Sequence, residues 1–454
     1  MVELLQTKLF IPRPRTKLVA RPRLVERLNA GIDKKLTLIA APVGSGKTTL
    51  LSEWVSQCPR RIAWYALEGD DNDATRFWAY FITSLQTVQP GMGENALNLL
   101  LSPQAPPITS ILVSLINDLA SRTGGFGVVL EDYHAIEHQA IHDTLTYLLT
   151  HLPDNVHLII TTRIDPPLPL ERMRANDQMN EFRASDLRFT TDETAWFFNQ
   201  AMGLNLSADD IAALEQRTEG WAAGLQIAAL TIKNKGDIAE FIRGFSGSHR
   251  HILGYLVEEV INRMPEKKLD FLLKTSILER LCGSLCDAVT DGSEGQTTLQ
   301  ELERENLFIE ALDDEGIWYR YHKLFAEVLI LRLKQVRPSL EPELHRKARK
   351  WLEENCFMHE AVAHAISAKD YELAAGLIER QLGENWLAGE LGTLQGWLNE
   401  IPEEAWQSYP RLWLVRAWVE MTIGDFVTAD ANLRAAEKTL TKLELGGRAS
   451  SRRK

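Results

Sequence analysis

The chain of 454 residues is 45% apolar and carries a net charge of −12, with an isoelectric point near 5.5. This length predicts about three domains with packed cores, and the composition excludes a disordered or fibrous protein. The acidic balance argues against a nucleic-acid-binding surface on the main body, because such surfaces carry a basic stripe.

No apolar run approaches the roughly 18–20 uncharged residues that a membrane span needs, and residues 1–15 lack the apolar stretch of a signal peptide. We therefore expect a cytoplasmic protein without a membrane partner. Four cysteines, Cys58, Cys282, Cys286 and Cys356, are too few and too scattered for a disulfide framework. We predict reduced thiols, with Cys282 and Cys286 buried in a core.

Both ends of the chain are basic. Residues 1–30 carry seven Lys and Arg side chains against two Glu side chains, and residues 446–454 combine two glycines with four Lys or Arg side chains. Short basic segments at chain ends are most often solvated. We predict an N-terminal arm over residues 1–30 and a disordered tail over residues 446–454.

Residues from about Lys35 to Thr162 alternate between short β-branched runs and amphipathic stretches, which is typical of a parallel sheet covered by helices, and we predict an α/β core over residues 31–186. The predicted strands are Leu36–Ala40, Arg61–Leu67, Gly127–Glu131 and Val156–Thr161. The predicted helices are Thr48–Gln57, Ala74–Thr87, Ser110–Ser121 and Ile141–His151. The pattern indicates a doubly wound α/β core.

After a proline-rich connector at Asp165–Pro169, helical periodicity dominates. We predict a helical subdomain over residues 187–265 and a winged-helix domain over residues 266–337. Its wing is indicated by the apolar runs Leu307–Leu312 and Ile317–Tyr321, which an Asp-Asp-Glu-Gly turn separates.

From residue 338 onward, short helices pair with Ala and Leu at the crowded positions. Such pairs stack as an α-solenoid, whose units bury their apolar faces only against neighbours. We predict an incomplete array of TPR-like helical repeats over residues 338–445.

A Walker A loop lies between the first predicted strand and the following helix. Its sequence is Ala41-Pro42-Val43-Gly44-Ser45-Gly46-Lys47-Thr48, with Ala41 in place of the first glycine of the strict motif. Glycines are needed because backbone N–H groups turn inward around phosphate oxygens, where a Cβ would obstruct them. Lys47 is expected to reach the β- and γ-phosphates, and Thr48 to place its hydroxyl on Mg²⁺. The motif predicts bound ATP or ADP with Mg²⁺, contacted by Pro42, Gly44, Ser45, Gly46, Lys47, Thr48 and Thr49.

A Walker B strand should end in a carboxylate that holds the metal, and Gly127–Asp132 matches. Two neighbouring acids leave two registers open. In one, Glu131 lies at the metal beside Thr48 and Asp132 positions the attacking water; in the other, the roles are reversed. Both acids could also simply leave the strand into solvent.

Arg163 follows the next predicted strand, at the edge where open parallel sheets bind ligands. An arginine there can contact a γ-phosphate through charge-assisted hydrogen bonds, although arginine also commonly ends a strand at the surface. The spacing of His134, His138 and His142 invites a metal hypothesis, which we set aside because the span crosses a strand-to-helix connection.

Taken together, these motifs resemble the STAND signal-transduction NTPases of the maltose-regulon activator (MalT-like) type, which are LuxR-family transcriptional regulators with an AAA+/STAND-like core. The resemblance covers nearly the whole chain, although relatives usually have two aspartates where this chain has Glu131-Asp132. It is carried, in order, by Lys8–Pro14, Leu18–Arg21, the Walker A loop, Trp64–Leu67, Asp70–Asp73, Leu130–His134, Thr161–Arg163, Gly220–Gln226 and Tyr321–Phe325.

The resemblance implies a switch that rests with ADP, is active with ATP, hydrolyses ATP slowly and forms a homo-oligomer when a small-molecule or protein inducer reaches the solenoid. It implies that Arg21 lies near the adenine, that Arg163 is the first sensor, and that His322 contacts the phosphates. A buried histidine at a helix start is the other interpretation of His322. DNA binding is expected only through a C-terminal helix-turn-helix that these residues do not include.

Two other functions fit the same motifs. A free-standing ATPase or remodeller would use Lys47, Glu131, Asp132 and Arg163 for steady turnover. A scaffold would bind its partner through the solenoid and hold the nucleotide for structural reasons.

Overall fold

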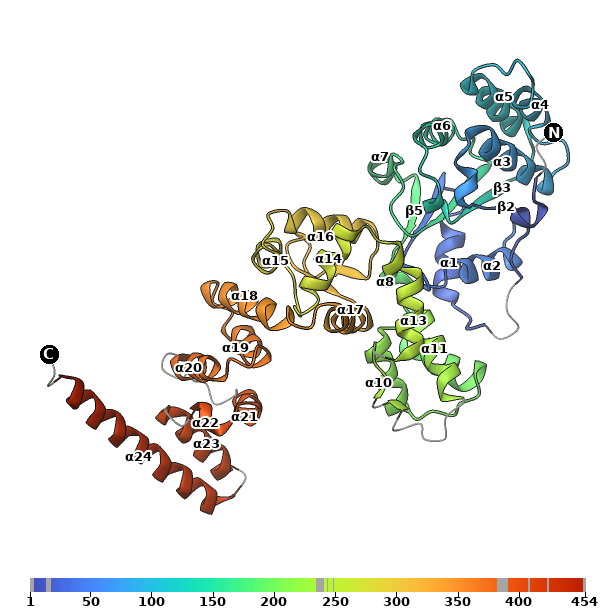
Figure 1. The fold of residues 1–454 in the computed structure, drawn as a ribbon. Coiled ribbons are helices and arrows are strands. Elements are labelled where there is room, and N and C mark those ends of the chain that lie inside the picture. The colour runs from blue at the N-terminus through green and yellow to red at the C-terminus, as the bar shows by residue number, and fades with distance from the viewer. Residues whose placement is uncertain are drawn as a thin grey trace. The chain divides into compact units, whose positions relative to one another are not determined.

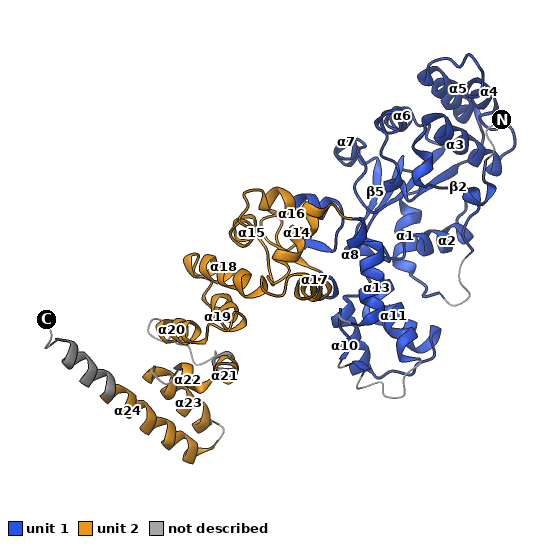
Figure 2. Cartoon of the chain, in the orientation of Figure 1, with its two compact units in different colours: residues 1–263, 300–310, 322–325 blue, residues 264–299, 311–321, 326–454 orange. Residues whose placement is uncertain are grey.

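The computed structural model describes residues 4–13, 18–233, 241–242, 244–247, 249–381, 391–406, 409–422 and 424–451. The chain divides into two compact units, which Figure 2 shows in different colours. Unit 1 comprises residues 1–263, 300–310 and 322–325; unit 2 comprises residues 264–299, 311–321 and 326–454.

A five-stranded parallel sheet forms the centre of unit 1. Its strands are β1 (Leu36–Ala40), β2 (Arg61–Ala66), β3 (Phe126–Glu131), β4 (Val156–Thr162) and β5 (Met179–Phe182). They pair in the order β2-β3-β4-β1-β5, with Leu38 of β1 opposite Ile160 of β4. Because β4 lies between β1 and β3, the carboxyl ends of these three strands are neighbours along one edge of the sheet.

Helices cover both faces of this sheet (Figure 1), as its apolar strands require. On one face, Leu28 of α1 (Pro22–Ala30) and Trp54 of α2 (Lys47–Gln57) join a buried cluster with Ile159 of β4. A second cluster joins the opposite face to further helices. These are α3 (Ala74–Val88), α4 (Glu94–Leu100), α5 (Ile108–Ser121), α6 (Gln139–Thr150) and α7 (Leu170–Ala175).

All four predicted strands are confirmed to within one residue at either end. The fifth strand, β5, was not predicted, because its sequence Met-Asn-Glu-Phe is half polar and half-exposed along the edge of the sheet. The aromatic residues of α3 are buried, as core packing predicts.

The prediction of a solvated N-terminal arm is wrong. Lys8 is 4% exposed and its ammonium lies 2.7 Å from Asp71, while Leu24 and Leu28 of α1 are buried. Four basic side chains of this segment, those of Lys8, Arg21, Arg23 and Arg27, have acidic partners elsewhere in unit 1, which composition alone does not reveal. Arg27, for example, pairs with Asp186 at 2.6 Å.

Short helices follow the core in unit 1, where a helical subdomain was predicted. They are α8 (Ala184–Leu187), α9 (Thr191–Trp196), a π-helical turn (Phe197–Ala201), α10 (Ala208–Thr218), α11 (Ala222–Ile232) and α13 (Arg250–Glu259). Helix α10 begins with a capping box between Ser207 and Asp210. It ends in a sharp turn, since Glu219 and Gly220 both have positive φ, of 48° and 69°. This turn sets the entry of α11.

The predicted wing is present as a two-stranded sheet of β6 (Ile309–Ala311) and β7 (Tyr319–Tyr321). The helices around it are α14 (Glu266–Thr275), α15 (Gly283–Thr290), α16 (Gly295–Arg304) and α17 (Lys323–Val336). The C-terminal helices of unit 2 are α18 (Glu341–Glu354), α19 (Met358–Ser367), α20 (Tyr371–Gln381), α21 (Leu391–Glu400), α22 (Glu403–Trp406), α23 (Pro410–Thr422) and α24 (Phe426–Ser451). Consecutive pairs such as α18 and α19 pack together, while their assignment as TPR-like repeats stays a prediction.

Two further expectations concern the chain ends and the thiols. Helix α24 extends to Ser451, and the predicted disorder of residues 446–454 stays a prediction. Residues 452–454 lie outside the described residues. Cys282 and Cys286 are buried, as predicted. Within the described ranges, no helix is long and apolar enough to cross a membrane.

Candidate nucleotide-binding site

The loop between β1 and α2 has the backbone geometry of a phosphate cradle. Gly44 and Gly46 have φ of +75° and +84°, in the left-handed region that glycine adopts without strain. Helix α2 begins directly after Gly46, and the free N–H groups of its first turn favour an anion. The Ser45 hydroxyl donates to the Pro42 carbonyl at 3.0 Å, which braces the loop, whereas Thr49 is exposed.

Lys47 is buried beneath this loop. Its ammonium donates to the carbonyl oxygens of Ala41 at 2.7 Å and Pro42 at 3.1 Å. Burial lowers the pKa of Lys47 to about 8, against the attraction of the Asp132 carboxylate, while the Arg163 guanidinium lowers it further. A buried ammonium held by neutral carbonyls gains from a phosphate close by, because the phosphate supplies the opposite charge. Lys47 therefore fits an anionic ligand.

Glu131 is held at both carboxylate oxygens. The Thr48 hydroxyl donates to Oε1, and the Trp64 indole Nε1–H donates to Oε2 at 3.0 Å. Burial raises the pKa of the Glu131 carboxyl, which these hydrogen bonds and Lys47 oppose. Since Thr48 is the hydroxyl that the motif assigns to Mg²⁺, the arrangement favours the register in which Glu131 lies at the metal.

Asp132 lies one residue beyond the strand and has different surroundings from Glu131. Its φ of 58° places it in the left-handed region, its backbone N–H donates to the Thr161 hydroxyl at 3.0 Å, and its side chain is 46% exposed. This accessible carboxylate suits a group that positions a water molecule. The roles of Glu131 and Asp132 stay predictions.

Arg163 follows β4 and therefore lies at the same sheet edge. Its guanidinium lies 3.4 Å from Oε2 of Glu259 in α13, and its side chain is 26% exposed. The position fits the predicted sensor, and the ion pair ties it to the helical subdomain. A phosphate contact by Arg163 stays a prediction.

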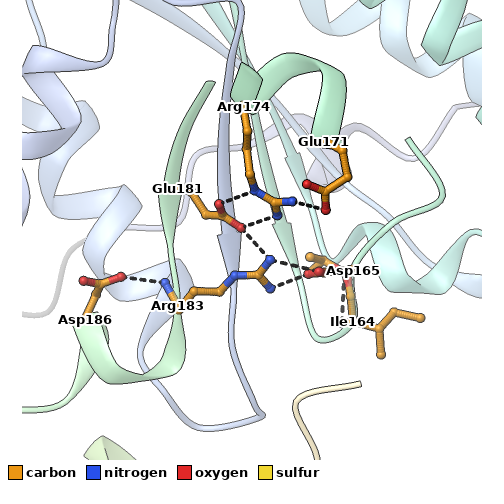
Figure 3. Close-up of polar contacts among 8 residues, drawn as sticks. Ile164, Asp165, Glu171, Arg174, Glu181, Arg183 and Asp186 are labelled. Carbon is orange, nitrogen blue, oxygen red and sulfur yellow. Dashed lines mark hydrogen bonds and ion pairs between the residues drawn. The ribbon is translucent and has the colours of Figure 1, made fainter. Parts of the chain in front are cut away.

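A network of charged side chains fixes the connector after Arg163 (Figure 3). The Arg183 guanidinium donates to both carboxylate oxygens of Asp165 and lies 2.5 Å from Glu181. Arg174 in turn donates to both oxygens of Glu181, at 2.9 and 2.8 Å. The network joins the end of β4 to β5 and so holds the backbone two residues beyond Arg163.

The three histidines considered above do not share one face. His134 lies with Nδ1 3.8 Å from Asp132, and burial lowers its pKa to about 4. His142 is buried and contacts the Tyr133 hydroxyl at 2.8 Å, whereas His138 is exposed. In the part of the chain that the structure describes, no group of three His, Cys, Asp or Glu side chains could hold a metal ion by itself.

Arg21 is buried and held by the segment that joins α8 to α9 and by α9 itself. It donates to the carbonyls of Leu187 at 2.9 Å and Arg188 at 2.7 Å, and it pairs with Glu193 at 3.1 Å. Its guanidinium also stacks over Phe189, 4.6 Å from the ring centre. These contacts give Arg21 a structural role; its predicted place near the adenine is untested.

His322 lies directly before α17 and is 8% exposed. Its Nε2 lies 3.0 Å from the carbonyl oxygen of Thr218, and its ring centre lies 6.0 Å from that of Trp221. This geometry matches the interpretation as a buried histidine at a helix start, while the phosphate contact stays a prediction.

The site fits a magnesium nucleotide. Mg²⁺ typically takes one or two protein ligands and completes its coordination with phosphate oxygens. Thr48 and Glu131, which lie within hydrogen-bond distance of each other, can supply the protein ligands. The sequence did not predict the contacts of Trp64 and Thr161. Both lie in buried strands, where a side chain that can form hydrogen bonds within an apolar run was the signal available.

The fold and the site define the class of this protein. A parallel sheet carries a Walker A loop after β1, an acidic Walker B end after β3 and an arginine after β4. This is the core of a P-loop NTPase, as predicted.

Comparisons with known proteins show which proteins the chain is similar to. Residues 257–341 match the MalT winged helix domain. The chain is 31% identical over 442 residues to the HTH-type transcriptional regulator MalT of Vibrio cholerae, an alignment that covers 97% of this chain and 49% of MalT. It is 33% identical over 435 residues to the serine/threonine-protein kinase PknK of Mycobacterium tuberculosis, covering 95% of this chain and 39% of PknK.

Among solved structures, a STAND protein with a tetratricopeptide repeat sensor from Pyrococcus horikoshii is 20% identical, with a TM-score of 0.37, and covers 94% of this chain and 59% of that one. The chain spans about half the length of the curated relatives, or less. It carries a MalT winged-helix domain and is similar over nearly all of its length to MalT-like regulators, which confirms the resemblance that its motifs indicate.

Proposed function

We propose that this chain is the nucleotide-binding switch of a MalT-like transcriptional regulator. It binds ATP or ADP with Mg²⁺, changes its domain arrangement and assembly with the identity of the nucleotide, and hydrolyses ATP slowly. The observation that carries the proposal is the convergence of three strand ends on one site, with Lys47 and Thr48 after β1, Glu131 at the end of β3 and Arg163 after β4.

Each of these residues has a separate task in the proposal. Lys47 holds the phosphates, and Thr48 with Glu131 places Mg²⁺, which neutralises phosphate charge when bound. Asp132 orients the water that attacks the γ-phosphate, and Arg163 responds to the presence of that phosphate. Because Arg163 is paired with Glu259, a new bond to phosphate competes with the tie to α13.

We further propose that a small-molecule or protein inducer acts through the C-terminal helices, and that the active form is a homo-oligomer. The similarity to MalT, whose name describes a helix-turn-helix transcriptional regulator, supports this assignment.

Sedimentation velocity and hydrogen exchange of the chain with ADP and with ATP test the switch. The proposal predicts a change in exchange at α13 and in sedimentation between the two nucleotides, both lost in Lys47→Ala. Identical behaviour in both nucleotides contradicts a switch and supports a scaffold. Turnover above about 1 s⁻¹, the low end of ordinary enzymes, supports a free-standing ATPase or remodeller instead.

A further inference from the structure

Two residues at the start of α11 contact the Walker A loop through hydrogen bonds. The Trp221 indole Nε1–H donates to the carbonyl of Val43 at 3.1 Å, and the backbone N–H of Ala223 donates to the carbonyl of Gly44 at 3.0 Å. The C=O and N–H of a trans peptide point in opposite directions. Fixing the carbonyls of Val43 and Gly44 therefore fixes the directions of the next N–H groups, those of Gly44 and Ser45, which are phosphate donors in a loop of this kind.

Residues from the winged-helix segment of unit 1 contact the ring of Trp221. Phe308 meets it edge-on with ring centres 5.3 Å apart, and His322 lies 6.0 Å away. Trp221 is 5% exposed, so the ring has little room to move. The indole thus connects Phe308 and His322 to the phosphate-binding loop.

Phe308 has an unusual backbone conformation. Its φ is +53°, in the left-handed region that a bulky side chain rarely adopts. Such strain persists only where the surroundings hold it, and it is concentrated at functional and switch positions. The surroundings here are Trp221, Phe325 at 5.2 Å between ring centres, and His322, whose N–H donates to the Phe308 carbonyl at 2.7 Å.

His322 also holds the turn that leads into Trp221. A carbonyl oxygen only accepts, so Nε2 of His322 carries the proton in its 3.0 Å contact with the Thr218 carbonyl. The next residue, Lys323, donates its backbone N–H to Glu219 at 3.0 Å. Two consecutive residues at the start of α17 therefore fix the turn from Thr218 to Trp221.

We propose that Trp221 is a positioning residue of the Walker A loop, and that Phe308 and His322 set the position of its ring. His322 then influences the nucleotide through Thr218, Trp221 and Val43. The inference rests on the proposed function in so far as the loop binds nucleotide. If Phe308 or His322 moves, the Walker A loop becomes less ordered. Conversely, binding of phosphate by the loop holds Trp221 against Phe308 and His322.

Hydrogen exchange of the loop in the purified chain, without added nucleotide, tests this directly. Trp221→Phe keeps an aromatic ring and removes the N–H donor. Amides in residues 41–48 should exchange about tenfold faster in this variant, because one stabilising hydrogen bond is worth about that factor. Trp196→Phe is the matched control, since Trp196 is 41% exposed in the same run of helices, and it should change neither loop exchange nor ADP affinity.

The affinity for ADP, followed by calorimetry, provides the second measurement. The affinity should fall about tenfold in Trp221→Phe and in His322→Leu. It should recover in His322→Gln, whose amide again donates to the Thr218 carbonyl. In the double variant, Trp221→Phe with His322→Leu, it should fall no further than in either single variant. If Trp221 had only a structural role, His322→Gln would not restore the affinity for ADP that His322→Leu loses.

The outcomes separate the two proposals. Unchanged loop exchange in Trp221→Phe overturns the role of Trp221, whether or not nucleotide binds. A wild-type chain that binds no nucleotide overturns the proposed function, while loop exchange still decides the role of Trp221. If Trp221→Phe fails to fold, Phe308→Leu retains the indole, and faster loop exchange in this folded variant supports the inference, whereas unchanged exchange overturns it.

Discussion

The indole N–H of Trp64 donates a 3.0 Å hydrogen bond to Oε2 of Glu131. Trp64 is fully buried in β2, beside the strand that ends in Glu131. The other carboxylate oxygen, Oε1, accepts a hydrogen bond from the Thr48 hydroxyl. The side chain of Glu131 is thereby directed toward the Thr48 hydroxyl, whereas the backbone of Asp132 is in the left-handed region, with φ of 58°.

This arrangement predicts different effects for the two acids. Glu131→Gln should abolish most of the Mg²⁺ dependence of nucleotide affinity, because an amide is a much poorer ligand for Mg²⁺ than a carboxylate. Asp132→Asn should leave that dependence within about twofold and lower the hydrolysis rate by roughly 10²-fold. Binding of a fluorescent nucleotide over a range of Mg²⁺ concentrations measures the first effect. A larger loss of Mg²⁺ dependence in Asp132→Asn would assign the metal to Asp132.

The pKa of Lys47 predicts a pH dependence of stability. Its folded-state value of about 8 lies below the ordinary 10.5, so between these values the unfolded chain binds more protons than the folded chain. The buried charge therefore destabilises the fold below pH 8, and this cost is relieved as pH rises toward 10.5.

Relative to Lys47→Met, the free energy of unfolding of the wild type should rise by about 2 kcal/mol between pH 7.5 and 9.5. Urea unfolding of both proteins, without nucleotide, measures the difference. Equal slopes with pH would show that Lys47 keeps an ordinary pKa in the folded chain.

The two loop glycines should tolerate alanine differently. A Cβ on Gly44 would lie 2.6 Å from Cβ of Ala223, whereas one on Gly46 has its nearest neighbour at 3.9 Å, and both residues have positive φ. Gly44→Ala should therefore lower stability and ADP affinity more than Gly46→Ala, which suffers backbone strain alone, on the order of 1–2 kcal/mol. Gly69→Ala is the control, with nothing within 4 Å. Thermal unfolding and calorimetry of the three variants provide the comparison, and equal losses at both loop positions would argue against the contact with Ala223.

The charged network behind Arg163 should contribute measurably to stability. Arg183→Met leaves the carboxylates of Asp165 and Glu181 without their shared cation, at a cost of roughly 1–3 kcal/mol for partly buried groups. Lys267→Met breaks an exposed pair with Glu294, where the expected change is below about 0.5 kcal/mol. Chemical unfolding compares them. A cost at Arg183 no larger than that at Lys267 would mean that the network does not hold the connector.

The sequence predicted the parts of the site that are contiguous. The Walker A loop and the acidic strand end follow from backbone and phosphate chemistry over a few residues, and the structure brings Thr48 and Glu131 together as one register expected. Buried strands were also predictable, because both of their faces are apolar.

Contacts between distant segments were not predictable. Trp64 and Glu131 are 67 positions apart, and only strand pairing brings them together. Composition marked the N-terminal segment as solvated, yet Lys8 and Arg21 find buried acidic partners in Asp71 and Glu193. Strand β5 was missed because an edge strand has only part of its surface to bury.

Calorimetric titration of Mg²⁺-ADP into the wild-type chain and into Lys47→Ala tests the central claim most directly. The account predicts one nucleotide per chain for the wild type and at least a hundredfold weaker binding, roughly 2.7 kcal/mol, once the buried ammonium is removed. Binding of equal affinity in both proteins would contradict the assignment of the Walker A loop as the nucleotide site.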